Sequence, residues 1–461
     1  MVFSSLLFLF WFIPIFFAVY YVTPMRFRNA VLFAGSIVFY AWGEPKYLLL
    51  IFASIIVNYL GGRMLAASRL RRGADSNAPR IWMIATLIFD FGMLFLFKYT
   101  DFFIDNINSL FNANISHVGF TLPLGISFYT FQIASYIIDL YRGRIEEERS
   151  ILNLATYLVM FPQLIAGPIV IYSQVSDELG NRRITLEDIE EGIGVFTIGL
   201  ASKVLIANNV GALWNDIGGI GFENISMPLA WMGVLAYTLQ IYFDFNGYSL
   251  MAIGLGKMLG FNIPRNFNHP YISLSLTEFW RRWHITLSGW FRDYLYIPLG
   301  GNRKGRARTY LNLFIVWFAT GFWHGAGWNF ILWGLFFFVM LSAEKSFLAK
   351  FLDNHKVFAR IYSVLLISLS WMIFAITDMH EMGVFFGRLV SFTKGADALY
   401  YLRNYAVLLC LGCVLSTPLL SDVWAKIKHK WYGVVITLLL LAVSIAYLTD
   451  AAYNPFLYFR F

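Results

Sequence analysis

Charged residues are scarce in this chain of 461 residues. Asp, Glu, Lys and Arg make up 13% of the sequence, about half of the share that is usual in a soluble domain, whereas 59% of the residues are apolar. A soluble globular protein is therefore excluded. Several apolar runs approach or exceed the roughly 20 residues that a helix needs to cross a hydrocarbon core of about 30 Å. They cover residues 2–21, 47–62, 81–97, 227–243, 311–343, 406–420 and 433–448.

A closed β-barrel is excluded as well, because its strands would show as short alternating segments instead of continuous apolar runs. Weaker runs lie around residues 28–42, 117–138, 152–172, 192–207 and 361–376. Together the runs predict an all-α, polytopic membrane protein of about eleven transmembrane helices. No repeat or linker divides the chain, so we expect a single membrane domain over residues 1–461.

The basic residues indicate an orientation. Arg26 and Arg28 follow the first apolar run and none precedes it, which is the wrong order for a secretory signal peptide. We expect this run to stay as a helix with its N-terminus outside the cell. The five arginines of residues 63–80 then lie in the cytoplasm, as the positive-inside rule requires. Orientation and lipid headgroups account for the net charge of +8, and no nucleic-acid partner is expected.

Cysteine is nearly absent. Cys410 and Cys413 have CxxC spacing, but no further cysteine completes a metal site, so we interpret them as apolar residues that pack on one helix face and expect no metal. The chain also lacks a G-x-S-x-G elbow, an H-E-x-x-H pair and a P-loop. These absences exclude the corresponding hydrolases, zinc proteases and ATPases.

Helix-breaking residues interrupt two apolar stretches. Pro123 and Gly125 lie in residues 122–143, and Pro162 and Pro168 lie in residues 161–170. Non-helical backbone at membrane depth is tolerated where protein or a water-filled cavity satisfies it. Both stretches thus predict re-entrant or broken helices beside a cavity; simple kinks between packed helices are the alternative.

Residues 244–308 are too polar to span the membrane and too aromatic for a solvated loop. At helical spacing one face carries Trp280, Trp283, His284, Leu287 and Phe291, and another carries Arg281, Ser288 and Arg292. We expect an amphipathic helix in the plane of the interface, with its aromatic face in the membrane and its arginines toward phosphate groups. Those groups belong either to lipid heads or to an anionic cofactor, and the sequence leaves both open.

The run of residues 311–343 has no charge and would be about 50 Å long as one helix, some 20 Å more than the hydrocarbon core. Basic residues flank both ends, which predicts a helical hairpin with residues 322–328 at its tip; a tilted helix is the alternative. Its histidine, His324, should be neutral, because the membrane penalises an imidazolium. A neutral ring is a base that can take a proton from a hydroxyl as that oxygen attacks an acyl thioester. His284 is a second candidate.

Two longer stretches carry a resemblance. "RNFNHPYISLSLTEFWRRWHITLSGWFRDYLYIPLGGNRKG" and "TGFWHGAGWNFILWG" resemble the signature region of the membrane-bound O-acyltransferase superfamily, in particular its bacterial branch similar to the alginate O-acetylation membrane protein. "FYAWGEPKYLLL", "LPLGISFYTFQ" and "FPQLIAGPI" are similar to that branch too. The resemblance implies that His324 is the essential catalytic histidine and that His284 holds the second signature position.

It also implies helices around a central tunnel in the bacterial cytoplasmic (inner) membrane. The donor would be cytoplasmic acetyl-CoA, and the acetyl group would pass to an extracytoplasmic SGNH hydrolase-like partner or to a polysaccharide. Arg281, Arg282 and Arg292 are our own candidates for contacts with the CoA phosphates. Transfer of D-alanine from a carrier protein to teichoic acid is one alternative. A transporter that uses buried His and Arg, and a scaffold for a glycan-modifying partner, are the others.

Overall fold

The structure, a computed structural model, describes residues 1–73, 76–393, 395, 397–450 and 457. Among these residues every regular element is helical and none is a strand, so the predicted all-α class is confirmed. The chain forms two compact units. The first consists of Met1–Ile193 and Ala252–Pro264, and the second of Gly194–Met251 and Arg265–Phe461.

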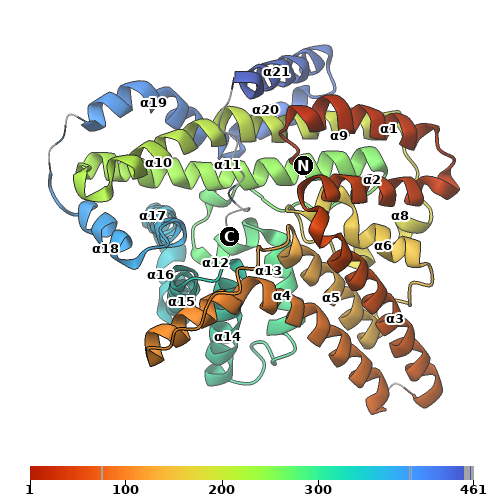
Figure 1. Ribbon diagram of the computed structural model, residues 1–461. Helices are drawn as coiled ribbons and strands as arrows, with labels where there is room; N and C mark the ends of the chain where they lie inside the picture. The colour runs from red at the N-terminus through yellow and green to blue at the C-terminus, as the bar shows by residue number, and fades with distance from the viewer. Residues whose placement is uncertain (74–75, 394, 396, 451–456, 458–461) are drawn as a thin grey trace. The chain divides into compact units, whose positions relative to one another are not determined.

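The first unit holds helices α1 to α8, the beginning of α9 and the end of α11 (Figure 1). Helix α3 ends where Gly73 adopts a positive φ, and the three arginines of its last turn, Arg69, Arg71 and Arg72, complement the helix dipole. The bounds are α1 Ile13–Val22, α2 Arg28–Gly43, α3 Leu48–Arg72, α4 Asn77–Phe111, α5 Ile126–Arg142, α6 Ile151–Val159, α7 Phe161–Leu164, α8 Ser176–Gly180, α9 Leu186–Ala201 and α11 Met227–Leu259.

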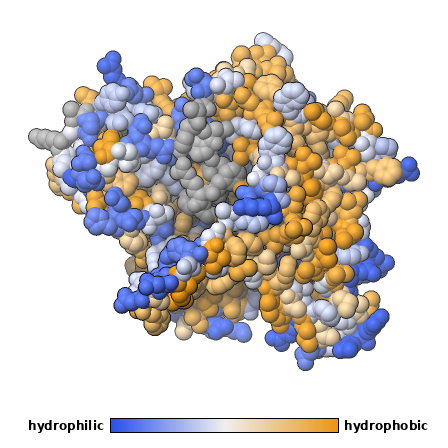
Figure 2. Space-filling model, in the orientation of Figure 1, coloured by the Kyte–Doolittle hydropathy of each residue, from blue (hydrophilic) through white to orange (hydrophobic). Residues whose placement is uncertain are grey.

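Seven helical segments among the described residues are long and apolar enough to cross a membrane, and the shorter apolar segment Phe8–Val22 joins them. Helices α2 and α3 carry hydrophobic side chains on their surface (Figure 2), as helices that face lipid do. The chain is thus a multi-pass membrane protein. The seven are Pro45–Arg72, Asn77–Phe111, Leu186–Ile220, Trp328–Asn354, Lys356–Ala375, Asp397–Leu415 and Trp431–Asp450.

The predicted broken helix after residue 160 is present in the first unit. Helix α6 ends at Val159, α7 is a single turn, and residues 165–171 are not helical although 165–170 are buried. Side chains satisfy the freed backbone: the Tyr157 hydroxyl donates to the carbonyl of Val170 at 2.9 Å, and the Ser36 hydroxyl accepts from the amide of Phe161 at 3.1 Å. Gly125, at φ 77°, begins α5 directly against the backbone of Leu164.

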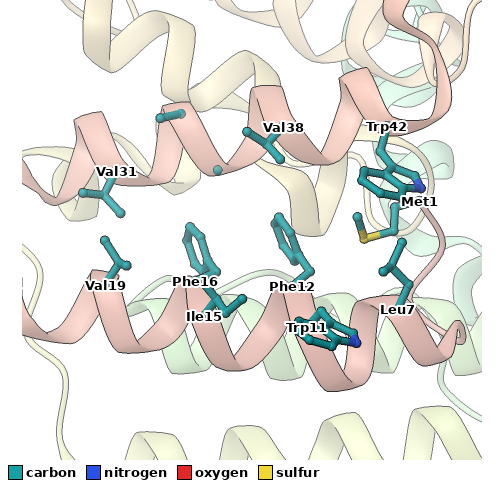
Figure 3. A pocket seen from close by; sticks show the side chains of 12 residues that line it. Met1, Leu7, Trp11, Phe12, Ile15, Phe16, Val19, Val31, Val38 and Trp42 are labelled. Carbon is teal, nitrogen blue, oxygen red and sulfur yellow. The ribbon is translucent and has the colours of Figure 1, made fainter.

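An apolar groove of about 430 Å³ lies between α1 and α2. Figure 3 shows Phe12 and Phe16 from the first apolar segment pointing toward α2, with Val19 opposite Val31. Every side chain that lines the groove is apolar or aromatic. Such a lining suits hydrocarbon and offers no acid, base or hydrogen-bonding pattern for a sugar or a nucleotide.

The second unit holds the end of α9, most of α11 and the remaining helices. Its core is rich in buried aromatic rings, among them Trp280, Trp283, Trp333 and Trp371. The bounds are α10 Asn208–Ile220, α12 Leu276–Arg282, α13 Ile285–Phe291, α14 Arg306–His324, α15 Trp328–Ala343, α16 Ala349–Asn354, α17 Lys356–Ala375, α18 Met379–Arg388, α19 Asp397–Leu415, α20 Pro418–Ile427 and α21 Trp431–Asp450.

The 33-residue apolar run forms the predicted hairpin, not a tilted helix. Helix α14 ends at His324, residues 325–327 turn the chain, and α15 returns beside α14 (Figure 1). Glycines allow the two backbones to touch: a Cβ at Gly321 would overlap the carbonyl oxygen of Phe330, and one at Gly334 would overlap that of Trp317. Small residues at such crossings are how helices pack closely in a membrane.

The segment from residue 276 to 291 departs from the predicted continuous helix. It breaks at His284, whose φ of 43° and ψ of 54° are left-handed, and so forms α12 and α13. The break is held by backbone hydrogen bonds to an earlier stretch. The amide of Ile285 donates to the carbonyl of Asn266, and the amide of Asn268 donates to the carbonyl of Arg282, both at 2.9 Å. Pairing with residues so distant in sequence outweighs local helical preference.

The assignment of the two faces of this segment is right, but the aromatic face packs against protein where we expected membrane. The ring of Trp280 lies 4.8 Å from that of Trp317 and 4.9 Å from that of Phe337, and the ring of Trp283 lies 4.7 Å from that of Trp371. All five residues of the aromatic face are buried, whereas Arg281 and Arg292 are exposed.

The predicted packing of Cys410 and Cys413 is wrong. Both are free thiols on the exposed surface of α19. Helix α19 is one of the candidate spans. An apolar face of such a helix can contact lipid, so apolar residues at helical spacing do not by themselves indicate packing against protein.

Replacing Gly321 with valine should separate α14 from α15. The new side chain meets backbone atoms, which cannot move aside, so we expect a loss of about 1–3 kcal/mol or more of stability. The Tm of the purified protein in detergent measures it. Gly387→Ala in α18 is the matched control, since nothing lies within 4 Å of the added methyl group, and it should leave the Tm unchanged or raised. Equal Tm values for the two variants would contradict the backbone contact.

Candidate active site

His324 sits at the tip of the α14–α15 hairpin inside a cage of aromatic rings. Its ring lies 4.9 Å from that of Trp323, 5.0 Å from that of Trp333 and 5.3 Å from that of Phe374, all edge to face. The side chain is buried, with 6% of its surface exposed. Packing of this kind restricts the imidazole to few orientations.

The tip is anchored to α17. The Asn329 side chain, at the start of α15, donates to the carbonyl oxygen of Phe374 at 3.0 Å and is itself buried. The rings of Phe330 and Phe374 pack 5.0 Å apart. Because Phe374 also borders His324, one hydrogen bond and one ring contact fix both the turn and the wall of the histidine cage.

His284 is oriented by Asn266. The amide group of Asn266 donates to the hydroxyl of Ser249 at 3.2 Å, and its carbonyl oxygen accepts from the hydroxyl of Thr286 at 2.9 Å. The same carbonyl oxygen lies 3.1 Å from Nδ1 of His284. Since that oxygen can only accept, Nδ1 must carry the proton. The lone pair of the ring is therefore on Nε2.

Nε2 of His284 is buried and has no hydrogen-bond partner among the described residues. The ring is fully buried, lies 4.7 Å from that of Phe245, and belongs to the segment between the candidate spans. Burial lowers the pKa of His284 to about 3, so the imidazole is a neutral base near pH 7. An unsatisfied buried acceptor of this kind is costly unless a ligand supplies the donor.

The structure brings the two predicted histidines to one aromatic cluster. Trp323 contacts both, with its ring 4.9 Å from that of His324 and 6.4 Å from that of His284. Two buried imidazoles therefore lie beside one indole, and the surrounding rings limit the access of water to both.

The three arginines predicted to bind the CoA phosphates do not point toward a common site. Arg281 is exposed on α12. Arg282 donates to Glu278 at 2.8 Å and to the carbonyl of Asn268 at 3.2 Å. Arg292 makes a two-point ion pair with Asp293 at 2.7 and 3.0 Å. A phosphate group would have to compete with these partners at Arg282 and Arg292.

Glu344 is a structural residue of the site that was not predicted from the sequence. It is buried at the end of α15, and its carboxylate accepts from the amides of Leu276 and Thr277 at 2.7 and 2.9 Å and from the Thr277 hydroxyl at 2.6 Å. It thereby joins the hairpin of His324 to the start of α12, the helix that leads to His284. Its signal in the sequence is a lone acid directly after the uncharged run.

Replacing Glu344 with alanine should leave the amides of Leu276 and Thr277, at the start of α12, without their acceptor. We expect a loss of about 1–3 kcal/mol for the buried amide of Leu276, less for the exposed Thr277, and a lower Tm. Thr277→Val removes only the hydroxyl donor and should lower the Tm less. A Tm that does not change in Glu344→Ala would show that the carboxylate does not hold α12.

Comparison with known proteins bears on this site. The model of the membrane-bound O-acyltransferase family, MBOAT, matches residues 144–377, which include both histidines and helices α12 to α15. The probable alginate O-acetylase AlgI of Pseudomonas putida is 38% identical and aligns over 100% of both chains.

Two further relatives carry other names. The peptidoglycan O-acetyltransferase of Helicobacter pylori is 33% identical over 100% of this chain and 98% of its own. The teichoic acid D-alanyltransferase of Bacillus subtilis is 30% identical over 49% of this chain and 59% of its own. The family model matches half of the chain, and two relatives are similar along its full length. The chain therefore belongs to the membrane-bound O-acyltransferase family.

Proposed function

We propose that this membrane O-acyltransferase takes acetyl from cytoplasmic acetyl-CoA and passes it across the bacterial cytoplasmic membrane for the O-acetylation of a polysaccharide. The acceptor is the polysaccharide itself or an extracytoplasmic SGNH hydrolase-like partner. The observation that carries the proposal is the position of His324 at the turn of a hairpin whose two open ends are basic.

Helix length supports transfer across the membrane. From Arg306 to His324, α14 rises about 27 Å, close to the thickness of a hydrocarbon core. With Arg306 and Arg308 on the cytoplasmic side, His324 lies toward the opposite side. A donor that enters from the cytoplasm and an acceptor that approaches from outside can then meet near one ring.

The names of the relatives favour acetyl as the acyl group. The two described above that align with the full length of the chain are named as O-acetyl-transferring enzymes, one for alginate and one for peptidoglycan. The D-alanyltransferase aligns with 49% of the chain. We therefore place acetyl transfer first and D-alanyl transfer second.

The chemistry follows from a neutral imidazole. The acceptor hydroxyl gives its proton to His324 while its oxygen attacks the thioester carbonyl carbon; a C–O bond forms, the C–S bond breaks, and the proton passes to the departing thiolate. Because ring and hydroxyl are both neutral at the start, little solvent must reorganise. His284 contributes an acceptor at Nε2 that can orient the hydroxyl or the donor.

Replacing His324 with alanine should abolish transfer of labelled acetyl from acetyl-CoA by the purified protein, a loss of about 100-fold or more. His355→Ala is the matched control, because His355 is exposed at the end of α16. Glycan acetylation in cells should fall in step. Retained acetylation in cells with His324→Ala would favour a scaffold, and ion-driven flux without acetyl turnover would favour a transporter. Labelled acetyl trapped on His324 would replace the base mechanism by a covalent relay.

Replacing Asn266 with alanine should weaken the reaction about 10- to 100-fold, the range seen when the residue that orients a functional histidine is lost. The ring of His284 then loses the acceptor that fixes its tautomer. The dependence of kcat/KM on pH should change too, which a purely structural loss would not produce. Asn268→Ala is the control: its side chain is exposed, two residues further along the chain, so this variant should behave like the parent protein. An unaltered pH profile in Asn266→Ala would contradict the orienting role.

A further inference from the structure

A single acidic residue interrupts the apolar run of residues 81–97. Asp90 lies within α4, one of the candidate membrane spans, and 4% of its surface is exposed. An ionisable side chain at such a position is expensive and marks a site with a partner. Asp90 has no role in the acetyl transfer proposed above.

The partner of Asp90 is Asn58 on α3, which is fully buried. The amide group of Asn58 donates to Oδ1 of Asp90 at 2.7 Å and to the backbone carbonyl of Ser54 at 3.0 Å. Because a backbone carbonyl can only accept, the orientation of the Asn58 amide is settled: its nitrogen faces Ser54 and Asp90, and its oxygen is left over.

Two buried oxygens of this pair have no hydrogen-bond partner among the described residues. They are Oδ2 of Asp90 and Oδ1 of Asn58. If Asp90 were ionised, both atoms would be acceptors without a donor, and a bare charge would lie inside a membrane span. One proton changes this, since a carboxylic acid at Oδ2 is the donor that the Asn58 oxygen lacks.

We infer that Asp90 and Asn58 form an intramembrane proton-binding site, in which Asp90 is protonated at Oδ2 and donates to Oδ1 of Asn58. Acid and amide then exchange two hydrogen bonds and hold α3 to α4 without net charge. The ligand is a single proton. This inference is independent of the acetyl transfer proposed above.

The packing of α3 on α4 favours a proton over a hydrated cation. Close to the pair, a Cβ at Gly61 would overlap the hydroxyl of Thr86, so the two helices touch. The phenol of Tyr129 interacts electrostatically with Asp90, and two charged side chains of these helices have partners of their own. Arg63 of α3 pairs with Glu147 at 3.3 Å, Lys98 of α4 contacts Ser127 at 3.3 Å, and Tyr129 of α5 is a buried phenol.

Asp90→Asn tests the inference, because an asparagine amide reproduces the protonated acid: it donates to Asn58 and accepts from it. The full-length protein in nanodiscs should keep its Tm in Asp90→Asn, and this Tm should not change with pH. In the parent protein the form with a protonated Asp90 is the more stable one, so the Tm should fall as the pH rises and Asp90 loses its proton. Asp90→Ala, which loses both hydrogen bonds, should have a lower Tm at every pH.

Infrared spectroscopy gives a second readout. The carbonyl stretch of a protonated carboxylic acid should be present in the parent protein at neutral pH, absent in Asp90→Asn, and retained in the control Asp177→Asn, whose side chain is exposed. A missing band together with a strongly lowered Tm in Asp90→Asn would overturn the inference. A Tm that sodium chloride raises and choline chloride does not, with the effect lost in Asp90→Asn, would replace the proton by a sodium ion.

Discussion

The contact of two helix backbones at Gly321 and Gly334 is the constraint on which the rest of the site depends. It sets the distance between α14 and α15, and so decides where the turn of residues 325–327 lies and where His324 points. Asn329 then fixes that turn to α17, and Glu344, at the other end of α15, fixes α12. The two histidines are therefore supported from one hairpin, by contacts made at both of its ends.

The site combines an apolar interior with a few fully defined polar contacts. Rings of Trp, Phe and His exclude water around His324 and His284, while Asn266 assigns the proton of one imidazole. Within such surroundings an imidazole that acts as the proposed base would not need to be desolvated during the transfer. Defined polar contacts in an apolar interior occur in the first unit as well. Where the helix is broken, the Tyr157 hydroxyl donates to the carbonyl of Val170, and the Ser36 hydroxyl accepts from the amide of Phe161.

The features of the fold and the site that have a local cause could be predicted from the sequence. The length of the run of residues 311–343 and the charges beside it are enough to predict a hairpin, and the prolines near residue 162 are enough to predict a broken helix. The break at His284 could not be predicted, because it depends on backbone pairing with Asn266 and Asn268. Helical spacing gave the buried face of Trp280 and Trp283, but amphipathicity does not say whether lipid or protein covers it. Asp90 was visible as one acid in an apolar run, but its partner on α3 was not.

The hairpin also has a consequence for how the protein is made. In the orientation proposed above, the hairpin enters the membrane and returns to the same side, and its two crossings cancel. The chain after Lys345 then keeps its orientation whether or not α14 and α15 have entered. The hairpin can thus be inserted late, as one preformed pair of helices, without reversing any helix that follows it. An insertion error at this hairpin would leave the orientation of the following helices unchanged and would leave His324 outside the membrane.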